Sequence, residues 1–223
     1  WIYSKCNMLF LSVSSVDPNL GRVEFSSLPQ QTLMEMLADG FVNKELIMDA
    51  EESYLDIHQW PHMHFTDSND LFRVEWRDLN ARSFHDGGIV QMQWLPSTVT
   101  IFALTGSKMK GTVDTEKLPE GLSSLFLQRN ALSGTLDLRH LPPSMKRFVL
   151  HSNQFNGSLN VAHLPKGLNS LLLHKNLFDG DVIVGKFPDE VHQIRLGGNQ
   201  ITGFVDANGE KVLIPVEISM GTY

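Results

Sequence analysis

The sequence predicts an α/β fold in which 23-residue units stack into a solenoid with a parallel sheet along one face. Three observations predict it. A Leu-Pro start, or Phe-Pro in the last unit, recurs every 23 residues, at Leu95, Leu118, Leu141, Leu164 and Phe187. Each unit then alternates apolar and polar residues with the period of two that is typical of a strand. Glycine occupies position 17 of all five units, counting the first residue of each unit as position 1.

The apolar positions of the unit define the expected strand. Position 10 is leucine in all five units, and position 8 reads Phe102, Leu125, Phe148, Leu171 and Ile194. One unit cannot bury these side chains alone, so stacked units must bury them against each other in a continuous core. Positions 19 and 21, such as Leu136 and Leu138, alternate again and predict short second strands or loops on the other side.

Two further positions, 13 and 17, are expected to form the bends between strands. Position 13 reads Ser107, Asn130, Asn153, Asn176 and Asn199. Asparagine amides can satisfy the backbone groups of neighbouring turns, so we expect a ladder of asparagines where the chain leaves each strand. The glycines at position 17 permit a tight or left-handed turn.

This pattern, LxxLxLxxNxLxG, resembles the leucine-rich repeat family over residues 95–209, about half of the chain. The Asn-x-Leu/Phe-x-Gly portion is similar to the plant-type subclass. The Leu-Pro start and the 23-residue period look more like the leucine-rich repeat proteins of kinetoplastids and related protists. The resemblance implies a right-handed solenoid, a horseshoe arc with the parallel sheet on its concave side. It implies no particular function, because function depends on sites rather than on the fold.

Residues 27–40 predict a helix. Ser27 and Gln30 have the spacing of a capping box, Pro29 falls in the first turn, and Gly40 stands where a helix ends. A helix at the start of the chain is expected to cap the exposed core of the first unit.

The segment after this helix resembles the N-terminal cap of plant-type repeat proteins, in which a helix precedes a C-x-W-x-G-V-x-C motif. Trp60 takes the place of the tryptophan and Met63 that of the valine. His58 and Phe65 stand where the two cysteines would be, and His62 replaces the glycine. The resemblance therefore implies a buried Trp60 in a cap that cannot form the disulfide.

These patterns divide the chain into four parts of one cooperative domain: residues 1–70 as an N-terminal tail and helical cap, 71–94 as a degenerate first coil, 95–209 as five repeats, and 210–223 as a C-terminal cap. In the degenerate coil, Val74 and Trp76 are the expected strand residues. Gly88 fits position 17 only if about five residues are inserted near 79–86.

The composition excludes several classes of protein. A net charge of −7 argues against a general nucleic-acid binder, and no apolar run is long enough to span a membrane. The single cysteine, Cys6, excludes an internal disulfide and a zinc site of paired cysteines. The first residue is Trp1, so the compartment stays open: the cytoplasm is favoured, with secretion or the cell surface as alternatives.

The sequence contains no nucleophile elbow, phosphate loop or zinc-protease motif, so we expect neither an enzyme nor a cofactor. His58, His62 and His64 have a possible metal spacing, but they belong to the cap motif, and no metal is predicted.

His151 and His174 both occupy position 11, one unit apart. They are expected either to share an ion or a proton or to be two exposed polar residues on a binding face.

The predicted function is a non-enzymatic scaffold for protein–protein interaction on the concave face. The alternatives are an ectodomain that senses or adheres to a glycan, peptide or lipid, and an enzyme or a regulatory fragment of one. The outward strand positions 6, 7, 9, 11 and 12 contain no Asp or Glu in the five units, and four of five residues at position 9 are apolar. We therefore expect a protein partner with an apolar anchor and acidic surroundings. The predicted site is Phe126, Arg129, Arg147, Val149, His151, Leu172, His174, Lys175 and Arg195. Lateral packing that only stabilises the sheet is the alternative for the apolar residues.

Overall fold

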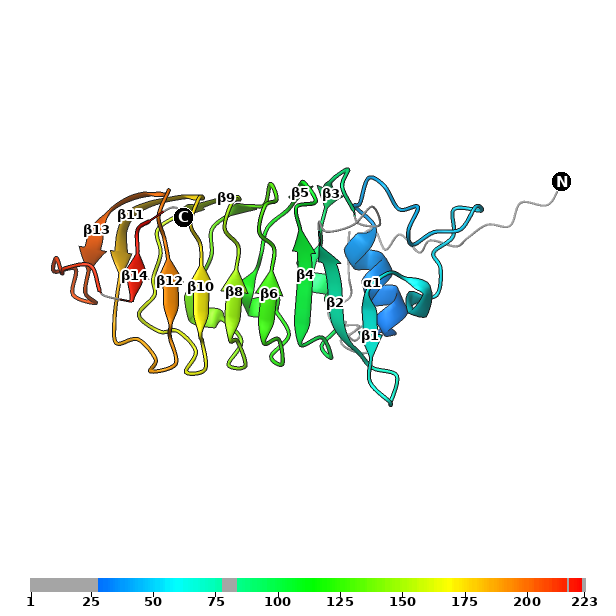
Figure 1. The fold of residues 1–223 in the computed structure, drawn as a ribbon, viewed down its shortest axis with the longest axis horizontal. Coiled ribbons are helices and arrows are strands. Elements are labelled where there is room, and N and C mark those ends of the chain that lie inside the picture. Colours follow the sequence, from blue (N-terminus) through cyan, green and yellow to red (C-terminus); the bar gives the residue numbers. More distant parts are fainter. Residues whose placement is uncertain (1–27, 78–83, 216, 222–223) are drawn as a thin grey trace, which may run out of the picture.

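The computed structural model describes residues 28–77, 84–215 and 217–221, and in it the chain coils into a solenoid with one long sheet (Figure 1). The strands of this sheet lie side by side in the order β1 (Met63–Phe65), β2 (Leu71–Arg77), β4 (Ile101–Thr105), β6 (Ser124–Phe126), β8 (Arg147–Val149), β10 (Ser170–Leu172), β12 (Gln193–Arg195) and β14 (Ile218–Ser219). Strand β1 is antiparallel to β2, and all other neighbours are parallel. The predicted parallel sheet is confirmed. Cys6 and Ser27 lie outside the described residues.

Shorter strands line the opposite side of the coils, within positions 14 to 20 of the repeat. One parallel sheet contains β7 (Ser133–Gly134), β9 (Gln154–Gly157), β11 (Leu177–Ile183) and β13 (Gln200–Val205), and β3 (Gly88–Ile89) pairs with β5 (Met109–Lys110). Single turns of 3-10 helix follow in the early coils: η3 (Met92–Trp94), η4 (Thr115–Lys117) and η5 (Leu138–His140). The opposite side therefore consists of short strands and loops, as the sequence predicts, but in the first three repeats the strands end before positions 19 and 21, which lie in loops or 3-10 turns.

The core consists of rows of side chains that run along the solenoid. The position-8 residues pair in register from strand to strand, and all are fully buried. Val74 belongs to the same row, because it pairs with Phe102. These two residues are 28 apart in the sequence, five more than the repeat, so the first coil carries the expected five-residue insertion. The row ends with Ile218, which pairs with Ile194.

The expected asparagine ladder joins each coil to the one before it. The Asn153 side-chain amide donates to the carbonyl oxygens of Leu127 and Leu150, at 2.9 and 3.0 Å, and its oxygen accepts from the Leu132 N–H at 3.1 Å. Asn130, Asn176 and Asn199 repeat this pattern. Each amide thus satisfies backbone groups of two coils that the bend would leave unpaired.

The position-17 glycines have positive φ in four of the five units, from 69° at Gly180 to 130° at Gly111. Gly203 is not among the glycines with positive φ. The pairing of β11 with β13 shifts between Gly180 and Asp181, so the last unit slips by one residue at this point. The shift in register thus coincides with the loss of the left-handed turn in this unit.

The N-terminal helix α1 (Gln30–Ala38) lies beside the first coil, where it buries Leu33, Met34 and Leu37 (Figure 1). The capping-box prediction is wrong for Gln30. Residue Pro29 is the N-cap without a side-chain bond, and the Gln30 amide instead binds Asn69 O at 2.7 Å and Leu71 N at 2.8 Å. A tertiary contact with the start of β2 therefore replaces a local one.

The turn η2 (Ile57–Gln59) leads into Trp60, which is only 3% exposed and donates its ring N–H to Leu55 O at 2.8 Å. The burial of Trp60 is confirmed. At the other end of the solenoid, the C-terminal tail covers the last coil only in part. Ile218 is buried, but Leu213 is 93% exposed. Within the residues described, no helix has the length and apolar character that a bilayer crossing requires.

Candidate partner-binding face

The nine predicted site residues lie on the outward side of the long sheet, over the neighbouring strands β6, β8, β10 and β12. Phe126, Val149, Leu172 and Arg195 form one row, because the parallel register places each opposite the next. Arg147 begins β8, while the two histidines, Arg129 and Lys175 follow the ends of their strands. We call these nine residues and their surroundings the outer face.

The predicted exposed apolar stripe is interrupted. At position 9, Ala103 is fully buried and Val149 is only 6% exposed, whereas Phe126 and Leu172 are half-buried. His174 is also buried, at 7% exposed, so it is not the exposed polar residue that the sequence suggests. Side chains in register on adjacent parallel strands pack against each other, and smaller ones are covered by larger neighbours. Lateral packing therefore accounts for part of the apolar row.

Phe126 contacts two arginines. The guanidinium carbon of Arg77 lies 5.2 Å from the ring centre, and that of Arg147 lies 5.4 Å from it. Such cation–π contacts hold the charged groups at the ring. Arg147 also donates to the Ser124 hydroxyl at 3.3 Å. The ring of Phe126 is thus a platform for cations as well as an apolar surface.

Arg77 was not among the predicted site residues. Arg77 belongs to β2 and forms an ion pair with Glu75. Glu75 lies opposite Ala103, so it continues the row of position-9 residues and adds a carboxylate to that row. Glu75 binds Arg77 at 2.7 Å and Arg73 at 2.7 Å. The alternation of Val74 and Trp76 as core residues could have placed Arg73, Glu75 and Arg77 on the outer face.

His151 and His174 stack across β8 and β10, with ring centres 4.2 Å apart and planes at 17°. Burial, followed by the charges of His174 and of nearby Arg129, lowers the pKa of His151 to about 4. Burial and the charges of Arg195 and Lys175 also lower the pKa of His174. Both rings are therefore neutral near pH 7.

Position 12 of the repeat has a left-handed backbone in all five units. The outer two residues are glycines, Gly106 and Gly198, but the middle three are Arg129, Ser152 and Lys175, with φ between 55° and 60°. This conformation is unfavourable for residues other than glycine. The sequence gives a partial signal, because glycine occurs at position 12 only in the first and last units.

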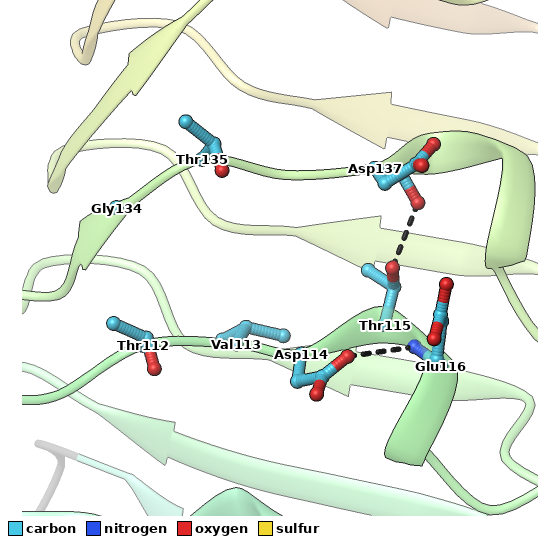
Figure 2. Close-up of a pocket in the computed structure, with 8 residues that line it drawn as sticks. All are labelled: Thr112, Val113, Asp114, Thr115, Glu116, Gly134, Thr135 and Asp137. Atoms are coloured by element: carbon cyan, nitrogen blue, oxygen red, sulfur yellow. Dashed lines mark hydrogen bonds between the residues drawn. The ribbon is translucent and has the colours of Figure 1, made fainter.

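A groove on the opposite side of the coils is lined by Thr112, Val113, Asp114, Thr115, Glu116, Gly134, Thr135 and Asp137 (Figure 2). Its polar groups hold the coils together. The Thr115 hydroxyl donates to Asp137 O at 2.7 Å, and the Asp114 carboxylate accepts from the Glu116 N–H at 3.2 Å. Asp137 caps η5 and binds the Arg139 guanidinium, which holds the pKa of that carboxyl below its usual range. These carboxylates act as turn caps.

The histidines near the N-terminus do not converge. His58 binds Asp56 and Asn69, whereas His64 lies 3.9 Å from Glu75. In the part of the chain that is described, no three potential metal ligands come together.

Comparisons with known proteins identify the fold. No family model and no curated protein matches the sequence. Among solved structures, a chain of the BIR3–SERK2 complex from Arabidopsis thaliana is similar to this protein. The match covers 77% of this chain and 93% of the matched chain, at 16% identity and a TM-score of 0.52. A pollen receptor kinase 3 matches over 78% of this chain and 84% of its own, at 19% identity and a TM-score of 0.56. The leucine-rich repeat ectodomain of the Arabidopsis thaliana receptor kinase SOBIR1 matches over 79% and 97%, at 14% identity and a TM-score of 0.56. The parallel rows, the asparagine ladder and these matches together establish that the described chain has the leucine-rich repeat fold.

Proposed function

We propose that this protein is a non-enzymatic scaffold that binds a protein partner on the outer face, the side expected to be concave. The partner would bring an apolar group to Phe126 and Leu172, with acidic residues around it. In this proposal the solenoid is right-handed, the segment with α1 caps its first coil, and the division into cap, first coil, five repeats and tail holds as the sequence predicts.

One observation carries the proposal, namely the charge of this face. Arg129, Arg147, Lys175 and Arg195 surround the half-buried Phe126 and Leu172, and no Asp or Glu occupies positions 6, 7, 9, 11 or 12 of the five units. The whole chain carries a net charge of −7, so this face has the opposite sign to the molecule. A basic face with an apolar centre favours an acidic partner and speeds its association.

The test is affinity purification from native cells, followed by mass spectrometry, with wild-type protein and the double variant Phe126→Ser, Leu172→Ser. The matched control is Ile89→Ser, Leu177→Ser, which changes two exposed apolar residues away from the outer face, 54% and 45% exposed. We expect a partner that the control retains and the outer-face variant loses, with the fold of all three intact by circular dichroism. Equal capture by both variants would reject the outer face as the site.

The charge contribution needs a separate variant, Arg147→Glu with Arg195→Glu. With the identified partner, association should slow and its dependence on salt should weaken, because electrostatic steering acts mainly on the association rate. An unchanged association rate would remove the electrostatic part of the proposal.

An ectodomain that binds a glycan, peptide or lipid is the second candidate. Asn156 begins an Asn-Gly-Ser sequon, and both Asn156 and Ser158 are exposed on and just after β9. Expression through a secretory pathway should then add a glycan, seen as a mass increase that Asn156→Gln abolishes. An unmodified Asn156 after such expression would count against this candidate.

A further inference from the structure

His151 and His174 are two titratable groups that stack against each other on the outer face, and His174 is buried. The Nδ1 atom of His151 lies 3.1 Å from the Ser152 hydroxyl. The Nδ1 atom of His174, on a side chain from a residue only 7% exposed, is buried and has no hydrogen-bond partner in the described chain. A buried polar atom without a partner costs free energy unless a ligand or water satisfies it.

Among the described residues, the charged groups that act on this pair are all cationic. Arg129 follows β6, Lys175 follows β10, and Arg195 ends β12, so cations approach from the strands on both sides. Burial is the main cause that lowers the pKa of both rings; Lys175 and Arg195 lower both further, and Arg129 lowers that of His151. The same positive field would repel a metal ion, so it disfavours a shared cation between the two histidines.

The backbone adds an independent observation. Arg129 and Lys175 hold a left-handed conformation that the equivalent Gly106 and Gly198 adopt without strain. Both side chains are exposed, and neither forms an ion pair among the described residues. Strained residues of this kind concentrate at functional sites. The middle coils therefore keep two cations, without an ion pair to any described residue, at positions where glycine would be more favourable.

We propose that the group formed by His151, His174, Arg129, Lys175 and Arg195, which we call the histidine corner, binds a carboxylate of the acidic partner and takes up a proton from solvent as it does so. This deepens the proposed function and rests on it. A carboxylate offsets the charge of the three cations, so a neighbouring imidazole can then bind a proton. The protonated ring has two N–H donors, of which one can bind the carboxylate.

The test uses hexaglutamate as the probe, hexaglutamine as the uncharged control, and isotope-labelled protein at low ionic strength. The probe remains ionised down to about pH 5.5. If one ring with a free pKa of about 4 regains its ordinary value near 6.5 in the complex, affinity should rise about tenfold between pH 7.5 and 5.5. The imidazole proton resonances of His151 or His174 should titrate at higher pH with hexaglutamate than without it. Bound hexaglutamate that leaves both titrations unchanged would overturn the proposal, as would no binding at all.

The location is tested by Arg129→Ala with Lys175→Ala, matched to Lys108→Ala with Lys110→Ala, which removes the same charge elsewhere on the solenoid. We expect the first variant to lose most of the hexaglutamate affinity and the second to keep it. Equal losses would show that the probe follows net charge alone and would overturn the assignment. A natural partner that needs Phe126 and Leu172 but binds with no pH dependence would contradict the histidine corner and leave the proposed scaffold function standing.

Discussion

His58 and Phe65 stack face to face, with ring centres 4.2 Å apart and planes at 20°. These are the two residues that stand in place of the cysteines in the cap motif that the sequence resembles. A non-covalent ring pair thus joins the two chain segments where a disulfide would do so. Asn69 and Asp56 bind the two nitrogens of the same imidazole.

The bonds from Asn69 and Asp56 raise the pKa of His58 above its ordinary value. We expect its ring to titrate above pH 6.5 in an NMR titration, and Asn69→Ala to lower that pKa. Because the folded pKa is raised, the stabilising effect is complete below the unfolded pKa and is lost as pH rises through the folded value. Asn208→Ala, in a distant turn, is the control and should leave the His58 titration unchanged.

Trp60 should be a major contributor to stability at the N-terminal end. Its ring is buried, packs 6.3 Å from the Trp76 ring and donates a hydrogen bond to Leu55. Trp60→Ala should lower the free energy of unfolding by about 3–5 kcal/mol in urea denaturation. Trp94→Ala, at a half-buried site, should cost less. Equal losses at the two sites would contradict the packing described for Trp60.

The position-10 leucines should differ according to their place in the stack. Leu150 and Leu196 are both fully buried. Leu150→Ala, in the middle, should lose about 2–5 kcal/mol. Leu196→Ala should lose less if the last coils unfold independently of the rest, as repeat proteins allow. Small and equal effects by chemical denaturation would be incompatible with a continuous core.

The left-handed position 12 predicts a stabilising substitution. Lys175→Gly should raise the free energy of unfolding by about 0.5–1 kcal/mol, because glycine adopts φ near 55° without the penalty of a Cβ atom. Gly198→Ala, at the same position two residues before Gln200, should have the opposite effect. The same Lys175→Gly change should weaken hexaglutamate binding, so stability and binding would move in opposite directions. A destabilising Lys175→Gly would refute the strain argument.

The histidine pair predicts a loss of stability in mild acid. The folded pKa of His151 is about 4 and lies below that of the unfolded chain, so the unfolded state binds the proton first. Its contribution is complete above about pH 6.5 and is lost as pH falls toward 4. His151→Gln should therefore flatten the dependence of the urea midpoint on pH between 6.5 and 4.5. The wild type and the variant would have parallel curves if the pair did not titrate in this way.

The sequence by itself determines the repeating part of this protein. Leucine at position 10 and asparagine at position 13 recur at a fixed interval, and each repeat meets the same neighbours one coil away. Local pattern and tertiary contact are therefore almost the same information in a solenoid. This is why the core rows, the bonds of Asn153 and the extra five residues before Phe102 follow from spacing alone.

Only the tertiary structure decides how side chains of different size share the outer face. Period two places Val149 and His174 outward, but neighbours in register cover them, so burial depends on the adjacent coils. The contact of Phe126 with Arg77 reaches outside the regular repeat, and that of Gln30 with Leu71 lies wholly outside it, so no spacing rule applies to either. The neutral state of the two stacked histidines is likewise a product of burial and of cations from several strands, because a pKa depends on all the charges around a group in space.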